Sequence, residues 1–164
     1  MKDNVKIRLS TYDDKKYLVK WLNDDEILKY FPMCDEREVE DAASYWISFV
    51  ANGAVLTAEI DNVPVGIATL YLHPYKKLAH QSLFPIIVDK NHRGKGVGSK
   101  ILIEMIKLAK EKFKIKLLHL EVYEGNPAIT LYERFGFKKY GFHKNFLKEK
   151  TGGYVGKILM QKVL

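Results

Sequence analysis

The chain contains little of what marks an exported or membrane-bound protein. Cys34 is the one cysteine among 164 residues, which excludes a disulfide within the chain and a metal site built from several cysteines. The longest uninterrupted apolar run, residues 83–88, is far too short to cross a bilayer. Residues 1–10 lack the apolar core of a signal peptide. We therefore expect a cytoplasmic protein with no membrane partner.

The histidines do not form a recognisable metal-ligand pattern. No cysteine or carboxylate cluster accompanies them, and their spacing matches no familiar ligand set. We therefore predict that the protein holds no metal. The five are His73, His80, His92, His119 and His143.

The sequence also lacks internal repeats, low-complexity tracts and Pro/Gly/Ser-rich linkers. Its apolar content of 47% is enough for a sizeable core, and its length suits one ordinary domain rather than two. We therefore predict a single domain over residues 1–164.

The formal net charge is +7, with lysines concentrated in residues 107–116 and 138–150. Such a balance suits an anionic ligand or partner. A nucleic acid and a coenzyme carrying several phosphates both qualify, and a merely solvated basic surface is a third possibility. Charge alone leaves these three readings open.

The amino-terminal third predicts one strand and two helices. Residues 5–10 alternate in polarity like a strand, and Thr11 followed by Asp14 is typical of a helix start. Asp35 and Glu38 have capping-box spacing ahead of a second amphipathic helix, which a turn at residues 52–53 should end.

The period then changes to that of extended chain. Residues 54–60, 65–73 and 80–88 predict three strands of an antiparallel meander. A helical pattern over residues 97–113 follows, and residues 117–123 resume as a strand.

The remainder predicts a short helix and two closing strands. Asn126 can cap this helix, with Pro127 at its first position and Gly136 just beyond its end. Strands around residues 137–146 and 154–163 complete a chain of the α+β class.

One segment, residues 88–99, carries most of the chemical information. It runs from a strand through alternating glycines, Gly94, Gly96 and Gly98, directly into a helix. Glycines let a phosphate approach the main chain, and the first N–H groups of a helix favour an anion. The spacing fits neither a Rossmann fingerprint nor a nucleotide P-loop. A pyrophosphate cradle and a plain tight strand–helix joint both remain open.

At this point the sequence resembles a known family, the GNAT N-acetyltransferases. Arg-Gly-Lys-Gly-Val-Gly at residues 93–98 resembles their coenzyme A motif. Residues 126–137, running from Asn-Pro-Ala to Gly-Phe, resemble their second motif. The chain is broadly similar to ribosomal-protein N-acetyltransferases, and it shares this similarity with many small-amine enzymes.

This resemblance implies a mixed, mainly antiparallel curved sheet of six to seven strands flanked by about four helices. The sheet would splay between residues 80–88 and residues 117–123, and the acyl-pantetheine arm of acetyl-CoA would occupy that gap. Pro85 fits a bulge or a loss of pairing there, and an ordinary edge strand explains it equally well.

The resemblance also implies which residues bind acetyl-CoA as co-substrate. A main-chain N–H near Ile87 or Val88 would receive the oxyanion. Asn126 could contact the coenzyme or merely cap its helix. The full expected set is Ile86, Ile87, Val88, Arg93, Gly94, Lys95, Gly96, Val97, Gly98, Ser99 and Asn126.

For catalysis, the resemblance places an acid at Tyr132, which would protonate the departing thiolate. The apolar stripe on that helix fits a core tyrosine as well. Glu121 resembles the position of a proposed base, although the loop after it is one residue shorter here, and a strand-end carboxylate facing water is the alternative. Glu59 and His80 are weaker substitutes.

The expected acceptor is a primary amine of a small molecule, a peptide amino terminus or a lysine. Tyr30, Phe31 and Trp46 lie where family members build the acceptor pocket, but packing explains them as easily. We expect no nucleic-acid partner and a monomer or homodimer. Two other readings compete with the enzyme: a catalytically silent acyl-CoA-binding regulator, and a nucleic-acid-binding module suggested by the lysines.

Overall fold

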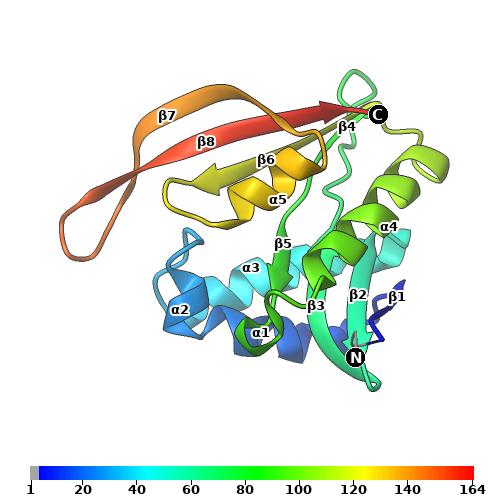
Figure 1. Cartoon of the computed structure of the whole chain (residues 1–164), viewed down its shortest axis with the longest axis horizontal. Coiled ribbons are helices and arrows are strands. Elements are labelled where there is room, and N and C mark those ends of the chain that lie inside the picture. The colour runs from blue at the N-terminus through cyan, green and yellow to red at the C-terminus, as the bar shows by residue number, and fades with distance from the viewer. Residues whose placement is uncertain (1–3) are drawn as a thin grey trace.

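A computed structural model describes residues 4–164 as two four-stranded sheets with helices on their faces (Figure 1). The strand orders are β1-β2-β3-β5 and β4-β6-β8-β7. The strands are β1 (Lys6–Leu9), β2 (Val55–Ile60), β3 (Val63–Thr69), β4 (Gln81–Leu83), β5 (Ile86–Val88), β6 (Leu117–Tyr123), β7 (Lys138–Lys148) and β8 (Tyr154–Val163).

Five α-helices and three short 3₁₀ helices complete the described residues. The α-helices are α1 (Lys15–Leu22), α2 (Asp25–Leu28), α3 (Glu36–Ser48), α4 (Val97–Glu111) and α5 (Ala128–Arg134). The 3₁₀ helices are η1 (Tyr12–Asp14), η2 (Phe49–Asn52) and η3 (Lys90–His92). Strands 1, 2, 3 and 5 pair antiparallel, as do strands 6, 8 and 7, and only β4 and β6 pair parallel. The predicted α+β class with a mixed, mainly antiparallel sheet is confirmed.

The predicted strand over residues 80–88 is wrong as a single element. It breaks at Phe84 and Pro85, so that the described residues contain eight strands instead of six to seven. The Phe84 N–H donates to the His119 carbonyl on the β6 side (3.2 Å), while the Pro85 carbonyl accepts from the Thr69 N–H on the β3 side (3.2 Å). Because proline has no N–H to extend a ladder, the chain changes partner here, and the two sheets diverge.

The helix starts follow the capping pattern. The Thr11 N–H donates to Asp14 Oδ2 (2.9 Å), and η1 leads directly into α1. Asp35 caps α3 as predicted, and Gly53, at φ 65°, ends the helical segment after η2. Helix α2 is not predicted by the sequence, because its four residues are too few to show a helical period.

Helices cover both faces of the first sheet. Helix α4 buries Ile101, Leu102 and Met105 completely against β2 and β3. It approaches closely because residue 66 is glycine: a Cβ there would lie 2.8 Å from Ile101 Cδ1. Helices α1 and α3 pack on the opposite face, around a second core that includes Ile67.

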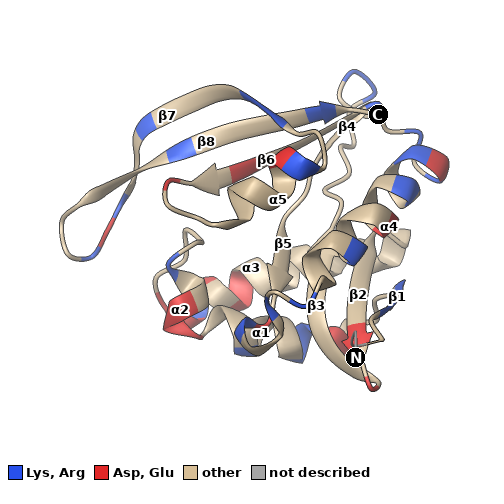
Figure 2. Ribbon diagram, in the orientation of Figure 1, with Lys and Arg blue, Asp and Glu red and all other residues tan. Residues whose placement is uncertain are grey.

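The β7–β8 hairpin reaches away from the rest of the fold (Figure 1), and most residues of β7 are exposed. Lysines lie on this hairpin and on the outer end of α4, mixed with acidic residues (Figure 2). The two lysine-rich stretches, 107–116 and 138–150, contribute nothing to the lining of the two larger cavities described below. Within residues 4–164, no helix has the length and apolar character required to span a membrane.

Candidate active site

A cavity of about 570 Å³ lies where β5, the start of α4 and α5 meet. We call it the cradle cavity. It brings together most of the residues predicted to hold coenzyme A. Its lining comprises Tyr30, Phe31, Ile86, Ile87, Val88, His92, Arg93, Gly94, Gly96, Val97, Gly98, Ser99, Asn126, Pro127, Ala128, Leu131, Tyr132 and Arg134.

The loop before α4 has the geometry of an anion site. Gly94 and Gly96 adopt φ values of 74° and 81°, which glycine accepts without strain. No atom lies within 4 Å of where their Cβ atoms would be, so the space above both remains open. The Lys100 N–H makes an early helical bond to the Gly96 carbonyl (3.1 Å). The N–H groups of residues 97–99 therefore have no partner within the helix, and together with the positive end of the helix dipole they suit an anion.

The permanent charges in the lining of the cradle cavity are positive. Arg93 and Arg134 line it, and no acidic residue does. Lys95 is the one member of the predicted 93–99 set that does not contribute to the lining. A pyrophosphate fits this combination of open glycines, main-chain donors and guanidinium groups.

Asn126 performs the predicted cap. Its Oδ1 accepts a hydrogen bond from the Ala128 N–H (2.9 Å). Helix α5 is assigned from Ala128, one residue later than predicted, although Pro127 already has helical dihedrals. Asn126 also lines the cradle cavity, so capping does not prevent it from facing a ligand.

The N–H groups of β5 divide between its partner strand and the cavity. The Asp89 N–H donates to the Val65 carbonyl (2.9 Å), and the Thr69 N–H donates to the Pro85 carbonyl (3.2 Å). The direction of the main-chain N–H groups alternates along an antiparallel strand. The N–H group of Ile87 therefore points toward β3, while those of Ile86 and Val88 point away from it.

A second cavity, of about 320 Å³, adjoins the first. We call it the aromatic cavity. The two cavities share Tyr30, Phe31, Ile86, Asn126 and Tyr132. The rest of its lining is Pro32, Met33, Ala42, Tyr45, Trp46, Tyr71, Leu83, Phe84, Pro85, Leu120, Glu121, Val122 and Tyr123. The predicted acceptor-side residues Tyr30, Phe31 and Trp46 are therefore all brought to one cavity.

Tyr132 lies at the boundary of the two cavities. It is 7% exposed and packs edge-on against Phe84 and Phe137, with ring centroids 6.5 and 6.1 Å away. The Phe137 N–H donates to the Tyr132 carbonyl (3.0 Å), and the Gly136 N–H to the Glu133 carbonyl (2.9 Å). These are the two bonds of a Schellman motif, which fixes the backbone at Tyr132. Burial raises the pKa of the Tyr132 phenol well above its usual value.

Glu121 reaches the aromatic cavity from β6. Its side chain is 43% exposed, and its Oε2 lies 3.1 Å from Lys157 Nζ. The two weaker candidates are not brought to either cavity: Glu59 instead pairs with Arg8 at 2.6 Å, and His80 lies in the turn before β4.

Several cavity residues were missed by sequence reasoning. Tyr45 and Tyr71 approach each other with ring centroids 4.8 Å apart, and Tyr123 lines the same cavity. Lys157, the partner of Glu121, comes from the distant strand β8. None carries a local sequence signal, because each is one tyrosine or lysine among many and only the tertiary fold gathers them.

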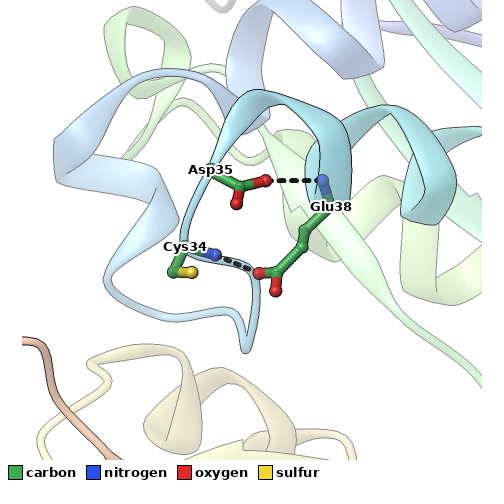
Figure 3. A group of neighbouring side chains, drawn as sticks. All are labelled: Cys34, Asp35 and Glu38. Carbon is green, nitrogen blue, oxygen red and sulfur yellow. Dashed lines mark hydrogen bonds between the residues drawn. The ribbon is translucent and has the colours of Figure 1, made fainter.

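One exposed cluster of possible metal ligands occurs in the described part of the chain: Cys34, Asp35 and Glu38 (Figure 3). Its carboxylates are already used in capping α3. Asp35 Oδ1 accepts from the Glu38 N–H (2.8 Å), and Glu38 Oε2 accepts from the Cys34 N–H (2.7 Å). The Glu38 carboxylate also raises the pKa of the Cys34 thiol, which disfavours the thiolate that binds metals. Helix capping therefore accounts for the cluster.

The sequence matches the acetyltransferase (GNAT) family over residues 15–137. The L-amino acid N-acetyltransferase AaaT of Escherichia coli is 31% identical over 109 residues, which are 66% of this chain and 67% of that protein. The spermine/spermidine N(1)-acetyltransferase of Bacillus subtilis is 42% identical over 52 residues. That match covers 31% of this chain and spans only 34% of the relative's length.

Solved structures share the fold over nearly the whole chain. The ribosomal-protein-alanine N-acetyltransferase of Brucella melitensis is 29% identical with a TM-score of 0.80, covering 97% of this chain and 99% of its own. The structure of yncA from Salmonella typhimurium with its cofactor acetyl-CoA gives a TM-score of 0.81 at 21% identity, covering 98% and 94%. The chain therefore belongs to the acetyltransferase (GNAT) family.

Proposed function

We propose that the protein transfers an acetyl group from acetyl-CoA directly to a primary amine, with Tyr132 as the acid. The observation that carries this proposal is the position of Tyr132 in the lining of both cavities. A thioester entering from the cradle cavity and an amine entering from the aromatic cavity would meet at this side chain. Direct transfer needs such a meeting point, and a protein that only bound acetyl-CoA would not.

The cradle orients the coenzyme. Main-chain N–H groups at residues 97–99 bind the pyrophosphate, and Arg93 adds a full positive charge. The open space over Gly94 and Gly96 lets the phosphates approach the backbone. The pantetheine arm then runs along β5 toward Tyr132.

In the chemical step the neutral amine nitrogen attacks the thioester carbonyl carbon. The new C–N bond places negative charge on the carbonyl oxygen, and the N–H groups of Ile86 or Val88, which β3 leaves unused, donate to it. These donors refine the predicted pair, since the ladder turns the Ile87 N–H toward β3. The C–S bond then breaks and releases a thiolate.

Tyr132 supplies the proton that the departing thiolate takes up. Because burial raises its pKa, the phenol stays protonated throughout the neutral range, as a general acid must. Its hydrogen passes to sulfur, and the phenolate takes up, through water, the second proton that the nitrogen loses as the amide forms. The products are an amide and free coenzyme A.

Glu121 is the group we assign to the amine proton. An alkyl ammonium with a pKa of about 10 must lose a proton before it can attack near neutral pH. Glu121 provides the one carboxylate of the aromatic cavity, so it can accept this proton directly or through a water. Lys157, 3.1 Å away, holds the carboxylate in place as a positioning residue.

A thiol-release assay with acetyl-CoA against a panel of amines tests this function. We expect coenzyme A and an acetylated amine in equal amounts, and none with the acceptor omitted. Tight coenzyme binding with no transfer to any amine would instead identify an acyl-CoA-binding regulator. The presence of a second cavity at Tyr132 favours the enzyme.

A further inference from the structure

The lining of the aromatic cavity restricts the kind of amine it can accept. Eight of its lining residues are aromatic, and Glu121 is the only one whose side chain carries a full charge near neutral pH. Phe31 and Trp46 pack at 5.9 Å between ring centroids, and Tyr45 and Tyr71 at 4.8 Å. Such a surface excludes water from an apolar group and gives ring faces for it to stack on.

The same surface can receive one positive charge. A primary amine enters protonated near neutral pH, and aromatic faces attract a cation within about 6 Å. The Glu121 carboxylate, whose side chain is 43% exposed, provides the opposite charge. One ammonium group is therefore well matched.

A negative charge on the acceptor has no such match. Lys157 is 8% exposed, and its Nζ lies 3.1 Å from Glu121 Oε2 and 3.6 Å from the Phe146 ring centroid. Lys157 does not contribute to the cavity lining. An acceptor carboxylate would meet Glu121 instead, and like charges at a binding site cost heavily.

A second positive charge is also unmatched. A polyamine would bring two or more ammonium groups to a cavity with a single acidic side chain, which can match only one of them. Burying the additional ammonium without a partner is unfavourable.

This inference rests on the proposed function. We infer that the acceptor is a monoamine whose amino group is attached to an aromatic or bulky apolar body. Any carboxyl group next to the amine is absent or is neutralised as an amide. A free arylalkylamine and the apolar first residue of a peptide share this chemistry. Both present one ammonium, an apolar body and no carboxylate.

Matched acceptors test the inference in the thiol-release assay. Phenylalaninamide and phenylalanine share the aromatic body and differ at the carboxyl group, and we expect kcat/KM, expressed per neutral amine, to favour the amide by about tenfold or more. The kcat/KM for spermidine should be lower than that for either acceptor without a carboxylate, phenylalaninamide or phenethylamine. A tripeptide amide beginning with phenylalanine separates the two sources, since it outranks phenethylamine if the natural acceptor is a peptide. Equal or better turnover of phenylalanine or spermidine would overturn the inference.

Two variants assign the selectivity to named residues. Glu121→Gln should reduce the ratio of kcat/KM for phenylalaninamide over phenylalanine to about threefold or less, because the repelling charge is removed. A base role lowers both values and leaves their ratio unchanged, so the ratio reports charge selection alone. An unchanged ratio would contradict the inference.

Tyr45→Ala should raise KM for phenethylamine by about three- to tenfold through loss of a ring contact. Tyr12→Ala is its control, since Tyr12 is as exposed (58% against 55%) and lies outside both cavities. Equal effects of the two changes would count against the aromatic cavity as the acceptor site. Failure of the inference leaves acetyl-CoA binding and transfer to other amines intact, whereas failure of the proposed function abolishes transfer to every amine.

Discussion

The two cavities that meet at Tyr132 are built from different materials. The cradle cavity depends on main-chain N–H groups and open glycines within the short segment of residues 93–99. The aromatic cavity depends on side chains from α3, β4, β5, β6 and α5 and from the segment before α3. The cradle cavity suits the diphosphate, a part of the ligand that is the same for every acceptor. The acceptor preference of the aromatic cavity can change with a few side-chain substitutions. We expect coenzyme binding to tolerate side-chain changes that alter acceptor choice.

The substitution Tyr132→Phe should show the largest difference between an effect on catalysis and an effect on coenzyme binding. Loss of the acid should lower kcat by about 10²-fold or more. The Kd for acetyl-CoA should change by less than about threefold, because residues 93–99, which bind the pyrophosphate, are unchanged. Steady-state kinetics and calorimetry on the same preparation measure the two quantities. Unchanged turnover would remove Tyr132 from the mechanism.

A glycine exchange tests the cradle side alone. Gly96→Ala forces a side chain into φ 81° and into the space left for phosphate, and we expect about tenfold weaker coenzyme A binding. Gly152→Ala is the matched control: its φ is 93° and its surroundings are also open, but it lies in the β7–β8 turn. If both variants bound coenzyme A as the wild type does, the main-chain cradle would be refuted.

The position of the Tyr132 backbone, between the two cavities, should depend on Gly136. Its φ of 83° forms the Schellman motif that fixes the backbone of Tyr132, and Gly136→Ala should lower the free energy of unfolding by about 1 kcal/mol. Denaturant titration measures this. Gly153→Ala, where the added Cβ meets nothing within 4 Å and φ is not positive, should change stability by only a few tenths of a kcal/mol. If Gly136→Ala left the free energy of unfolding unchanged, the Schellman motif would not be what fixes the backbone at Tyr132.

The smallest effect should be a change in stability at alkaline pH, and it should come from Tyr123 in the aromatic cavity. Burial, with the Glu121 charge adding to it, raises the pKa of Tyr123 to about 12. Above about pH 10 the unfolded tyrosine ionises while the folded one keeps its proton, so the free energy of unfolding falls as the pH rises. Tyr123→Phe should flatten this fall between about pH 10 and pH 12 in thermal melts. An identical slope in both proteins would contradict the assigned cause.

The cradle could be predicted from sequence because its chemistry is local. Alternating glycines, a strand before them and a helix after them lie within residues 88–99 and fix the main-chain geometry together. The same holds for Asn126 and Gly136, whose capping roles need only their own helix. Tyr132 was found through the family motif, since its apolar stripe alone also fits a core residue.

The break at Phe84 and Pro85 could not be placed from local pattern. An extended apolar run satisfies either sheet, and only the competition between β3 and β6 for its backbone groups decides where the partner changes. The aromatic cavity escaped prediction for the same reason. Tyr71 follows the end of β3 and Tyr123 ends β6, two strands of different sheets. The local sequence around either tyrosine does not indicate that the other is near.

Calorimetric titration of the folded protein with coenzyme A tests the central claim most directly. The account predicts saturable one-to-one binding that Gly96→Ala weakens about tenfold and Gly152→Ala leaves unchanged. Absence of measurable affinity for coenzyme A or acetyl-CoA would contradict it, since no thioester could then be presented to Tyr132.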